Sequence, residues 1–279
     1  MQIAILTGAE LRHDFVRILI AHTPGINVKR SYCEDIRLHP IIARKEGDNS
    51  QRLQHLIMRR QSESDFFSIF TTRTADQSNA VYIQNGEIND SQYVEEIESL
   101  EPDILIAYGC SIIKKPLLKK FGRKILNVHL GLSPYYRGSS TNYWPLVRGA
   151  PEYVGATFMY MDSGIDTGEI IHQIRARIFP GDSPHQIGNR LICDMALVYT
   201  EILKKHKKLT VMRQIPSSNE IEYCRRDDFS EHSVELLYDN FSTGMIDNYL
   251  DNMEKRCKNV PIVENPTVRT VETLRESKL

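Results

Sequence analysis

The sequence lacks any apolar run of the roughly 18 residues that a membrane-spanning helix needs. The apolar run near its N-terminus covers only residues 3–6, and no positive charge precedes it. We therefore expect a buried strand there and not a signal peptide. The five cysteines are odd in number and form no Cys-x-x-Cys pair. This argues against a disulfide framework or a zinc site and favours a reducing, cytoplasmic location.

An excess of charge of one sign is also missing. The chain has 35 Lys and Arg against 36 Asp and Glu, a net charge of −1, so the whole chain is not built to attract a polyanion. The motifs GxGxxG, HExxH and GxSxG and the Walker loop are absent. With 279 residues and 41% hydrophobic content, the chain is long enough for one large domain and a smaller appendage.

Strand and helix patterns alternate along the chain. Residues 2–6, 104–107 and 124–128 are apolar runs typical of buried strands, and helical spacing separates them. This alternation predicts an α/β fold with a Rossmann-like, mostly parallel sheet and helices on both faces. Ligands bind such sheets at the carboxyl ends of the strands. Residues 108–113 and 127–129 both lie at predicted carboxyl ends.

Between these strands the predictions are less regular. Residues 44–80 are polar and weakly periodic, which indicates helix fragments and loops on a surface. Asn89 is expected to cap a helix that runs to about Leu100, with Gln92 completing a capping box. Residues 156–161 and 169–179 are expected to form strands on either side of a turn.

The last third of the chain predicts a domain boundary. Ser183, Pro184 and Gln186 are typical of a helix start, and that helix ends in a basic run at residues 204–208. We predict a catalytic domain over residues 1–208 and a small α+β appendage over residues 209–279. The appendage is expected to hold a short hairpin near residues 214–223 and a helix near residues 230–253, interrupted at Gly244.

An amide, an imidazole and a carboxylate stand out as candidates for chemistry. Asn127 and His129 end a predicted strand, and Asp166 lies in a downstream Gly-Ile-Asp-Thr-Gly turn. Together such groups can hold an acyl oxygen, move a proton and orient the proton carrier. Taken singly, each residue has a structural interpretation: a packed histidine, a strand-end cap and a turn residue.

The order and spacing of four motifs resemble the formyltransferases that use N10-formyltetrahydrofolate. The motifs are Asn127-Val-His129, Pro134-Tyr-Tyr136-Arg137-Gly138, Gly155-Ala-Thr157 and Asp166-Thr-Gly168. The resemblance is strongest over residues 103–175 and extends over residues 1–204. It implies transfer of a formyl group from N10-formyltetrahydrofolate to a primary amine, without a metal ion.

The resemblance also implies roles for the three candidate catalytic residues. Asn127 would donate a hydrogen bond to the formyl oxygen as negative charge builds on it. His129 would help to bind that oxygen and relay the proton that leaves the amine. Asp166 would accept a hydrogen bond from the imidazole, fix its tautomer and stabilise its charged form.

Further residues are implied in binding the two substrates. The pterin of the folate would lie against two loops, largely on backbone groups; the residues concerned are Cys110, Ser111, Ile112, Ile113, Asp162, Ser163, Gly164 and Ile165. Core packing is an equal alternative for the two isoleucines at 112 and 113, and Cys110 is taken as lining and not as a nucleophile. The candidate acceptor contacts are Arg12, His13, Tyr136 and Arg137. For Arg137 we favour bracing of its loop through backbone carbonyls, and for Arg12 and His13 an exposed helix start is an equal alternative.

Two positions depart from the family pattern. Many relatives have His-Pro-Ser where this chain has His129-Leu-Gly131, so a possible hydroxyl contact is lost. Some relatives carry a second histidine where Met159 stands here, and others also have methionine. Neither departure removes the three catalytic candidates.

Three acceptors can be compared. Enzymes that formylate glycinamide ribonucleotide have a glycine-rich phosphate loop after the first strand, but residues 7–13 hold an acidic residue and no glycine cradle. Methionyl-tRNA enzymes need strong phosphate attraction and have a C-terminal barrel. Residues 209–279 carry 9 Lys and Arg against 13 Asp and Glu, a net charge of −4.

A nucleotide-linked amino sugar, as in bacterial surface-polysaccharide pathways, therefore suits the sequence best. The sugar enzymes add a short C-terminal piece often used in dimerisation, so a homodimer is a further expectation. The tail is expected to serve assembly or acceptor binding and not the chemistry. Neither a membrane nor a nucleic-acid partner is expected.

Other functions stay open. The alternatives are a methionyl-tRNA formyltransferase, an enzyme acting on an amino acid or hydroxamate-precursor amine, a formyltetrahydrofolate hydrolase, and a catalytically silent binding module. Hydrolase relatives carry a regulatory domain ahead of the first strand, whereas this chain opens on the strand itself. The intact Asn127, His129 and Asp166 argue against the silent module.

Overall fold

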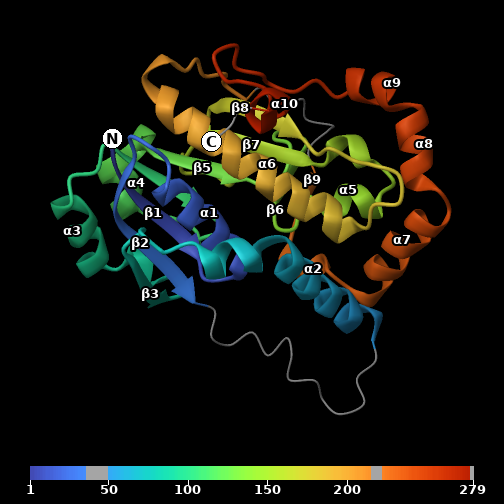
Figure 1. The fold of residues 1–279 in the computed structure, drawn as a ribbon, viewed down its shortest axis with the longest axis horizontal. Helices are drawn as coiled ribbons and strands as arrows, with labels where there is room; N and C mark the ends of the chain where they lie inside the picture. Colours follow the sequence, from blue (N-terminus) through green and yellow to red (C-terminus); the bar gives the residue numbers. More distant parts are fainter. Residues whose placement is uncertain (36–49, 215–221, 277–279) are drawn as a thin grey trace.

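The structure, a computed structural model, describes residues 1–35, 50–214 and 222–276. Its main sheet has seven strands in the order β3-β2-β1-β4-β5-β7-β8 (Figure 1). Their bounds are Gln2–Gly8 (β1), Asn27–Asp35 (β2), Ala80–Gln84 (β3), Ile104–Tyr108 (β4), Ile125–His129 (β5), Gly155–Tyr160 (β7) and Ile170–Arg175 (β8). The first five strands are mutually parallel, and β7 and β8 are antiparallel to their neighbours. The predicted Rossmann-like, mostly parallel sheet is confirmed.

Helices cover both faces of the sheet, as predicted. Two hydrophobic clusters lie on the two faces of the sheet: Ile3 and Ile5 of β1 belong to one, and Ala4 and Leu6 to the other. The first cluster includes residues of α1 (Leu11–Ala21), α2 (Gln51–Arg73) and α6 (Pro184–Lys205). The second includes residues of α3 (Ser91–Ser99) and α4 (Lys115–Phe121).

The same alternation fixes which way β5 presents its candidate residues. Leu126 and Val128 belong to the cluster beneath α1, α2 and α6, whereas Ile125 belongs to the cluster beneath α3 and α4. Because side chains alternate along a strand, Asn127 and His129 lie on the same face as Ile125. Both candidates therefore project from the α3 and α4 side, at the carboxyl end of their strand.

The prediction of helix fragments and loops after residue 50 is wrong. Residues 51–73 form one continuous helix, α2, and Ser50 caps it by accepting a hydrogen bond from Leu53 N at 3.2 Å. Phe67 is fully buried, with its ring 4.9 Å from that of Phe15. The buried face also holds His55 and Glu63, so its apolar periodicity is weak in the sequence. Residues 44–49 lie outside the described residues.

The predicted cap of α3 is also wrong by one residue. The N-cap is Asp90, and the side chain of Asn89 is used elsewhere. Its Nδ2 donates to Ile112 O at 3.1 Å and its Oδ1 accepts from Lys114 N at 2.7 Å. Asn89 thus ties the loop after β4 to the start of α3. By contrast, the predicted capping box of Ser183 and Gln186 at the start of α6 is confirmed.

The C-terminal segment packs back onto the main body. Leu237, Met245, Tyr249 and Val268 belong to the same hydrophobic cluster as β1 and β4. The predicted helix near residues 230–253 is confirmed and is interrupted at Gly244, which has a positive φ of 83°. The described part of the expected hairpin instead pairs in parallel with residues 136–138, and residues 215–221 lie outside the described residues.

Shorter elements complete the described chain. They are β6 (Tyr136–Gly138), α5 (Trp144–Val147), β9 (Glu222–Cys224), α7 (Glu231–Ser242), α8 (Met245–Asp251), α9 (Met253–Lys258), α10 (Val271–Glu276) and 3-10 turns at Glu87–Asn89, Gly122–Lys124, Pro151–Tyr153, His206–Lys208 and Arg226–Asp228. Helices α7, α8 and α9, orange to red in Figure 1, follow one end of the molecule. Within the described ranges, none of the helices combines the length and hydropathy needed to span a bilayer.

Two buried histidines link α2 and α6. The rings of His55 and His185 lie 4.6 Å apart between centroids. Burial lowers the pKa of His55 to about 3, and the nearby His185 and Arg59 add to the effect. Burial likewise lowers the pKa of His185 to about 4. The folded protein therefore keeps both rings neutral under mildly acidic conditions.

We expect stability to fall as the pH drops from about 6.5 to about 4. In this window the unfolded chain protonates both rings and the folded chain does not, so acid favours unfolding. One pKa unit corresponds to about 1.4 kcal/mol for each ring. Melting temperatures measured across the window should fall less steeply for His185→Leu than for wild type. His232→Gln, at an exposed ring on α7, is the control; identical slopes for wild type and His185→Leu would contradict the expectation.

Candidate active site

Asn127 offers a free amide at the carboxyl end of β5. It lies opposite Met159 of β7 in the antiparallel register. The side chain is half-buried, and among the described residues no hydrogen-bond partner reaches its amide. A half-buried donor without a partner is available to an oxygen of a bound substrate.

His129 and Asp166 lie together, as the sequence predicts. The imidazole Nδ1 is 3.4 Å from Asp166 Oδ2, and His129 is only 8% exposed. Asp166 adopts a positive φ of 53° in the turn between β7 and β8. Its Oδ2 also accepts a hydrogen bond from Gly138 N at 2.9 Å. The carboxylate is thus held in place before any substrate binds.

The other imidazole nitrogen points into the protein. His129 Nε2 is 3.1 Å from the carbonyl oxygen of Tyr136 and 3.2 Å from the hydroxyl of Thr141. A carbonyl oxygen can only accept, so Nε2 carries a hydrogen and donates it. The nitrogen left for reaction chemistry is Nδ1, which faces Asp166.

The turn that carries Asp166 is braced by a residue from the C-terminal segment. Gln214 Nε2 donates to Asp166 O at 3.0 Å and to Gly168 O at 2.7 Å. Arg137 donates in turn to Gln214 Oε1 at 2.8 Å. The bracing role favoured for Arg137 therefore has a contact in the structure, although it runs through a side-chain amide and not through backbone carbonyls. Burial lowers the pKa of Arg137.

This contact changes the expectation for the tail. Residues after 208 were expected to serve assembly or acceptor binding, but Gln214 bonds to two backbone carbonyls of the turn that carries Asp166. Asp162 closes the same turn from within, because its Oδ1 accepts from Gly164 N at 2.9 Å and from Thr167 Oγ1 at 2.6 Å.

A buried carboxylate holds the loop after β4. Glu34, at the end of β2 and 2% exposed, accepts from the backbone N–H of Ser111 and from its hydroxyl. Gly86 N donates to the same carboxylate at 2.7 Å. Both donors of Ser111 are therefore used within the protein, and its carbonyl is what remains for a ligand.

The two neighbouring isoleucines have opposite environments. Ile113 is 5% exposed and belongs to the core, whereas Ile112 is 71% exposed. Ile165, in the turn between β7 and β8, is 41% exposed. Ile112 and Ile165 are thus available for contact with a ring. The pKa of the Cys110 thiol is raised to about 12 by burial and by the nearby Glu34, so this thiol is not a nucleophile at neutral pH.

A cavity of about 460 Å³ lies between α4 and residues 161–163. It is lined by Lys115, Leu118, Lys119, Gly122, Arg123, Met161, Asp162 and Ser163. Asn127, His129 and Asp166 are not among its lining residues, and Met161 of its wall bonds to Ile125 O at the amino end of β5. Its volume is within the range of small-molecule sites.

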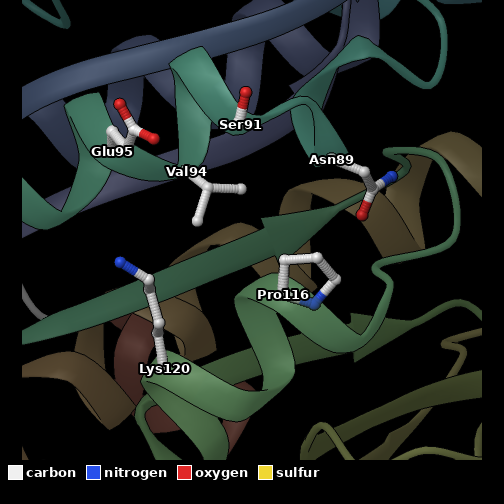
Figure 2. A pocket seen from close by; sticks show the side chains of 6 residues that line it. All are labelled: Asn89, Ser91, Val94, Glu95, Pro116 and Lys120. Carbon is white, nitrogen blue, oxygen red and sulfur yellow. The ribbon is translucent and has the colours of Figure 1, made fainter.

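A second cavity, of about 350 Å³, lies between α3 and α4 (Figure 2). Its lining consists of Asn89, Ser91, Val94, Glu95, Pro116 and Lys120. None of these is among the candidate catalytic or binding residues. Asn89 connects the cavity wall to the loop after β4 through the two hydrogen bonds described above.

The candidate acceptor contacts near β1 are largely engaged. His13 is 4% exposed, its Nδ1 accepts from Glu10 N at 3.2 Å, and burial lowers its pKa well below the usual value. Arg12 pairs with Glu63 at 2.9 Å. The ring of Tyr136 is buried, and this residue contributes its carbonyl to His129. Of these three, only the Arg12 side chain retains some exposure, at 15%.

Buried hydroxyl and amide groups that the sequence did not single out support the loop after His129. Thr157 Oγ1 donates to Gly131 O at 2.6 Å and accepts from Ser133 N at 3.0 Å. Gln173 Nε2 donates to Thr157 Oγ1 at 2.9 Å and to Ser133 O at 2.7 Å. The only sequence signal was the Gly-x-Thr strand that carries Thr157.

The arrangement can perform acyl transfer chemistry. A half-buried amide donor and an imidazole paired with a carboxylate lie together at the carboxyl end of one strand. These are the groups needed to hold an oxygen that gains negative charge and to move a proton beside it.

Comparison with known sequences places these residues in a family. Residues 50–203 match the family described as formyl transferase, and this span includes Asn127, His129 and Asp166. The methionyl-tRNA formyltransferase of Desulforamulus reducens is 29% identical over 193 residues, which cover 68% of this chain and 59% of the relative. That of Ruminiclostridium cellulolyticum is 35% identical over 124 residues, covering 44% and 38%. The chain thus spans about half of the length of the curated relatives it matches.

Solved structures share the fold. A phosphoribosylglycinamide formyltransferase from Anaplasma phagocytophilum superposes with a TM-score of 0.55 at 14% identity, covering 81% of this chain and 98% of the other. A 4-N formyltransferase from Francisella tularensis gives a TM-score of 0.52 at 18% identity, covering 82% and 77%. At these identities the likeness concerns the fold.

Proposed function

The chain belongs to the formyl transferase family, and we propose that it transfers a formyl group from N10-formyltetrahydrofolate to the primary amine of a nucleotide-linked amino sugar. The observation that carries the transfer chemistry is the pairing of His129 Nδ1 with Asp166 Oδ2 at 3.4 Å, beside the amide of Asn127, which has no hydrogen-bond partner among the described residues. N10-formyltetrahydrofolate supplies the formyl group, and the residues of this chain orient it and handle the proton.

Each of the three residues has a distinct task in the proposed reaction. Asn127 donates a hydrogen bond to the formyl oxygen, most strongly when that oxygen gains charge. His129 acts at Nδ1, because Nε2 is engaged by Tyr136 O and Thr141. As the amine bonds to the formyl carbon, His129 relays the proton released by the amine toward N10 of the folate, which leaves as the bond between N10 and that carbon breaks. Asp166 stabilises the charged imidazole from 3.4 Å.

The loops after β4 and between β7 and β8 suit a pterin ring. Ile112 and Ile165 present exposed apolar side chains, while Glu34, Asn89 and Asp162 hold the two loops by internal hydrogen bonds. Loops braced in this way keep their backbone N–H and C=O groups in fixed positions for a planar heterocycle. We therefore assign residues 110–113 and 162–165 to the folate.

Charge favours a small acceptor over a nucleic acid. The chain has a net charge of −1, and residues 209–279 have a net charge of −4. A protein that binds tRNA gains affinity by neutralising several phosphates, whereas a sugar nucleotide offers only a diphosphate. A methionyl-tRNA formyltransferase is the second candidate, because the relatives in Desulforamulus reducens and Ruminiclostridium cellulolyticum carry that name.

An acceptor panel tests the proposal. The purified protein is incubated at physiological salt with N10-formyltetrahydrofolate and, separately, nucleotide-linked amino sugars, glycinamide ribonucleotide, amino acids and charged initiator tRNA. We expect a formamide product, detected by mass, on an amino-sugar nucleotide and none on the tRNA.

The other outcomes separate the alternatives. Formylation of methionyl-tRNA at physiological salt would establish the second candidate. Formate released without any acceptor would indicate a hydrolase, and an absence of folate binding would indicate a silent binding module. The Asp166→Asn variant serves as the control for nonenzymatic formylation.

A further inference from the structure

Strands β6 and β9 form a ribbon whose two faces have different surroundings. In their parallel register Tyr136 lies opposite Glu222, and Arg137 lies opposite Tyr223. The guanidinium of Arg148 contacts both members of the first pair: it lies 5.5 Å from the centre of the Tyr136 ring and 3.1 Å from Glu222 Oε2. The first pair therefore shares one face. Because side chains alternate along a strand, Arg137 and Tyr223 lie on the other face.

The face that carries Arg137 and Tyr223 is directed toward the turn of Asp166. Arg137 Nη2 donates to Gln214 Oε1 at 2.8 Å, and Gln214 Nε2 donates to Asp166 O at 3.0 Å. Tyr223 lies one strand away from Arg137, at a spacing of about 4.8 Å. The ring of Tyr223 is therefore on the side of the ribbon that faces the candidate active site.

The ring of Tyr223 is also open to a ligand. Three aromatic side chains of the described residues are largely exposed: Tyr82 at 56%, Phe179 at 46% and Tyr223 at 49%. Single exposed rings are common on protein surfaces, but these three differ in position. Tyr82 belongs to β3, at the far edge of the sheet, and the guanidinium of Arg190 packs 4.6 Å from the centre of the Phe179 ring. Only Tyr223 combines an exposed ring with a place beside the candidate site.

A planar group of the acceptor remains to be placed. The pterin of the folate is assigned to residues 110–113 and 162–165, away from the ribbon. In a nucleotide-linked amino sugar the base and the reacting amine lie at opposite ends of the molecule, joined by the diphosphate. An amine at His129 thus leaves the base outside the reacting centre. Tyrosine rings stack on nucleobases, and each stacked base contributes enough binding energy to be measured.

We propose that Tyr223 stacks on the nucleobase of the acceptor and is thereby a specificity-determining residue. This inference rests on the proposed function, which supplies an acceptor with a base. Every base has a π face, so Tyr223 selects acceptors that carry a base and does not decide which base. The same stacking would serve the base of a sugar nucleotide or the terminal adenosine of a tRNA.

Calorimetry with UDP, TDP and ADP as probes tests the stacking directly. We expect the Kd of a nucleoside diphosphate that binds wild type to rise about 5- to 150-fold in Tyr223→Ala, the range that base–aromatic stacking accounts for. Tyr223→Phe keeps the ring and should bind as wild type does. Tyr82→Ala is the matched control, because it removes an equally exposed tyrosine at the far edge of the sheet.

Kinetics test the effect on acceptor choice. The sugar nucleotide is compared with the corresponding amino sugar 1-phosphate, which has the amine but no base. The ratio of kcat/KM for the first to kcat/KM for the second should fall in Tyr223→Ala by the same factor as the affinity for the nucleoside diphosphate. The fall should come mainly from KM. Tyr223→Phe and Tyr82→Ala should keep the wild-type ratio.

Three results would overturn the proposal: no binding of any of the three probes to wild type, equal binding to wild type and Tyr223→Ala, or a loss of folate affinity in Tyr223→Ala, which would place a ring of the donor there. If tRNA is the acceptor, a KM for tRNA raised in Tyr223→Ala would assign the base to the terminal adenosine, and an unchanged KM would refute the stacking. If no amine is formylated, the proposed function fails. The calorimetry still decides in that case whether Tyr223 holds a base.

Discussion

Replacing Asp166 with Asn should lower kcat by about 10²- to 10⁴-fold, the range typical for the loss of assisted proton transfer. The substitution removes the negative charge 3.4 Å from His129 Nδ1. It should leave the fold intact for two reasons. Asparagine tolerates the left-handed conformation at this position, where φ is 53°. Its amide oxygen can also keep the hydrogen bond from Gly138 N.

Steady-state kinetics with a saturating amine, together with folate binding and the melting temperature, check this expectation. Folate affinity and melting temperature should stay close to those of wild type. Asp182→Asn is the matched control, because Asp182 is a buried carboxylate paired with Arg190. That variant should lose stability but keep its turnover. Near-normal kcat in Asp166→Asn would refute the role given to the carboxylate.

Replacing Asn127 with Ala should lower kcat by about 10²- to 10³-fold, the usual loss when one donor to a developing oxyanion is removed. The amide has no partner among the described residues, so its removal breaks no hydrogen bond of the fold. Stability should therefore change little. The loss should appear in kcat more than in folate affinity, because the hydrogen bond strengthens as charge builds on the oxygen.

The matched control for this variant is Asn240→Ala. Asn240 Nδ2 donates to the carbonyls of Leu146 and Val147, so its removal should lower the melting temperature and spare kcat. Asn127→Ala should show the reverse pattern. If the two variants had equal effects on both quantities, Asn127 would be a structural residue and not part of the reaction.

Elements that can be recognised from residues close together in the sequence were predicted correctly. Apolar strands at β1, β4 and β5 are short runs that can be recognised without their partners. The catalytic candidates were proposed because Asn127 and His129 end a predicted strand and because the order of the four motifs resembles a known family. The Ser183 capping box is a similar case, since all of its groups lie within four residues.

The parts that were missed depend on distant contacts. Helix α2 buries His55 and Glu63 along with Phe67. Its buried face therefore mixes polar and apolar residues, and the sequence shows no clear helical repeat of apolar residues there. Gln214 is 48 residues from the Asp166 carbonyl that it binds, and Thr141 is 12 residues from His129. Nothing in the local sequence marks a single glutamine or threonine for such a role. These residues become visible only when the chain is folded.

The contact between Gln214 and the turn that carries Asp166 has a consequence for the order in which the candidate site is completed. A chain made from its N-terminus presents Asn127, His129 and Asp166 well before residue 214, and domains tend to fold as they emerge from the ribosome. Until Gln214 is synthesised, the carbonyls of Asp166 and Gly168 lack their donor. A nascent chain therefore carries Asn127, His129 and Asp166 for some time before Gln214 is made, and the turn at Asp166 gains these two hydrogen bonds only in the last quarter of translation.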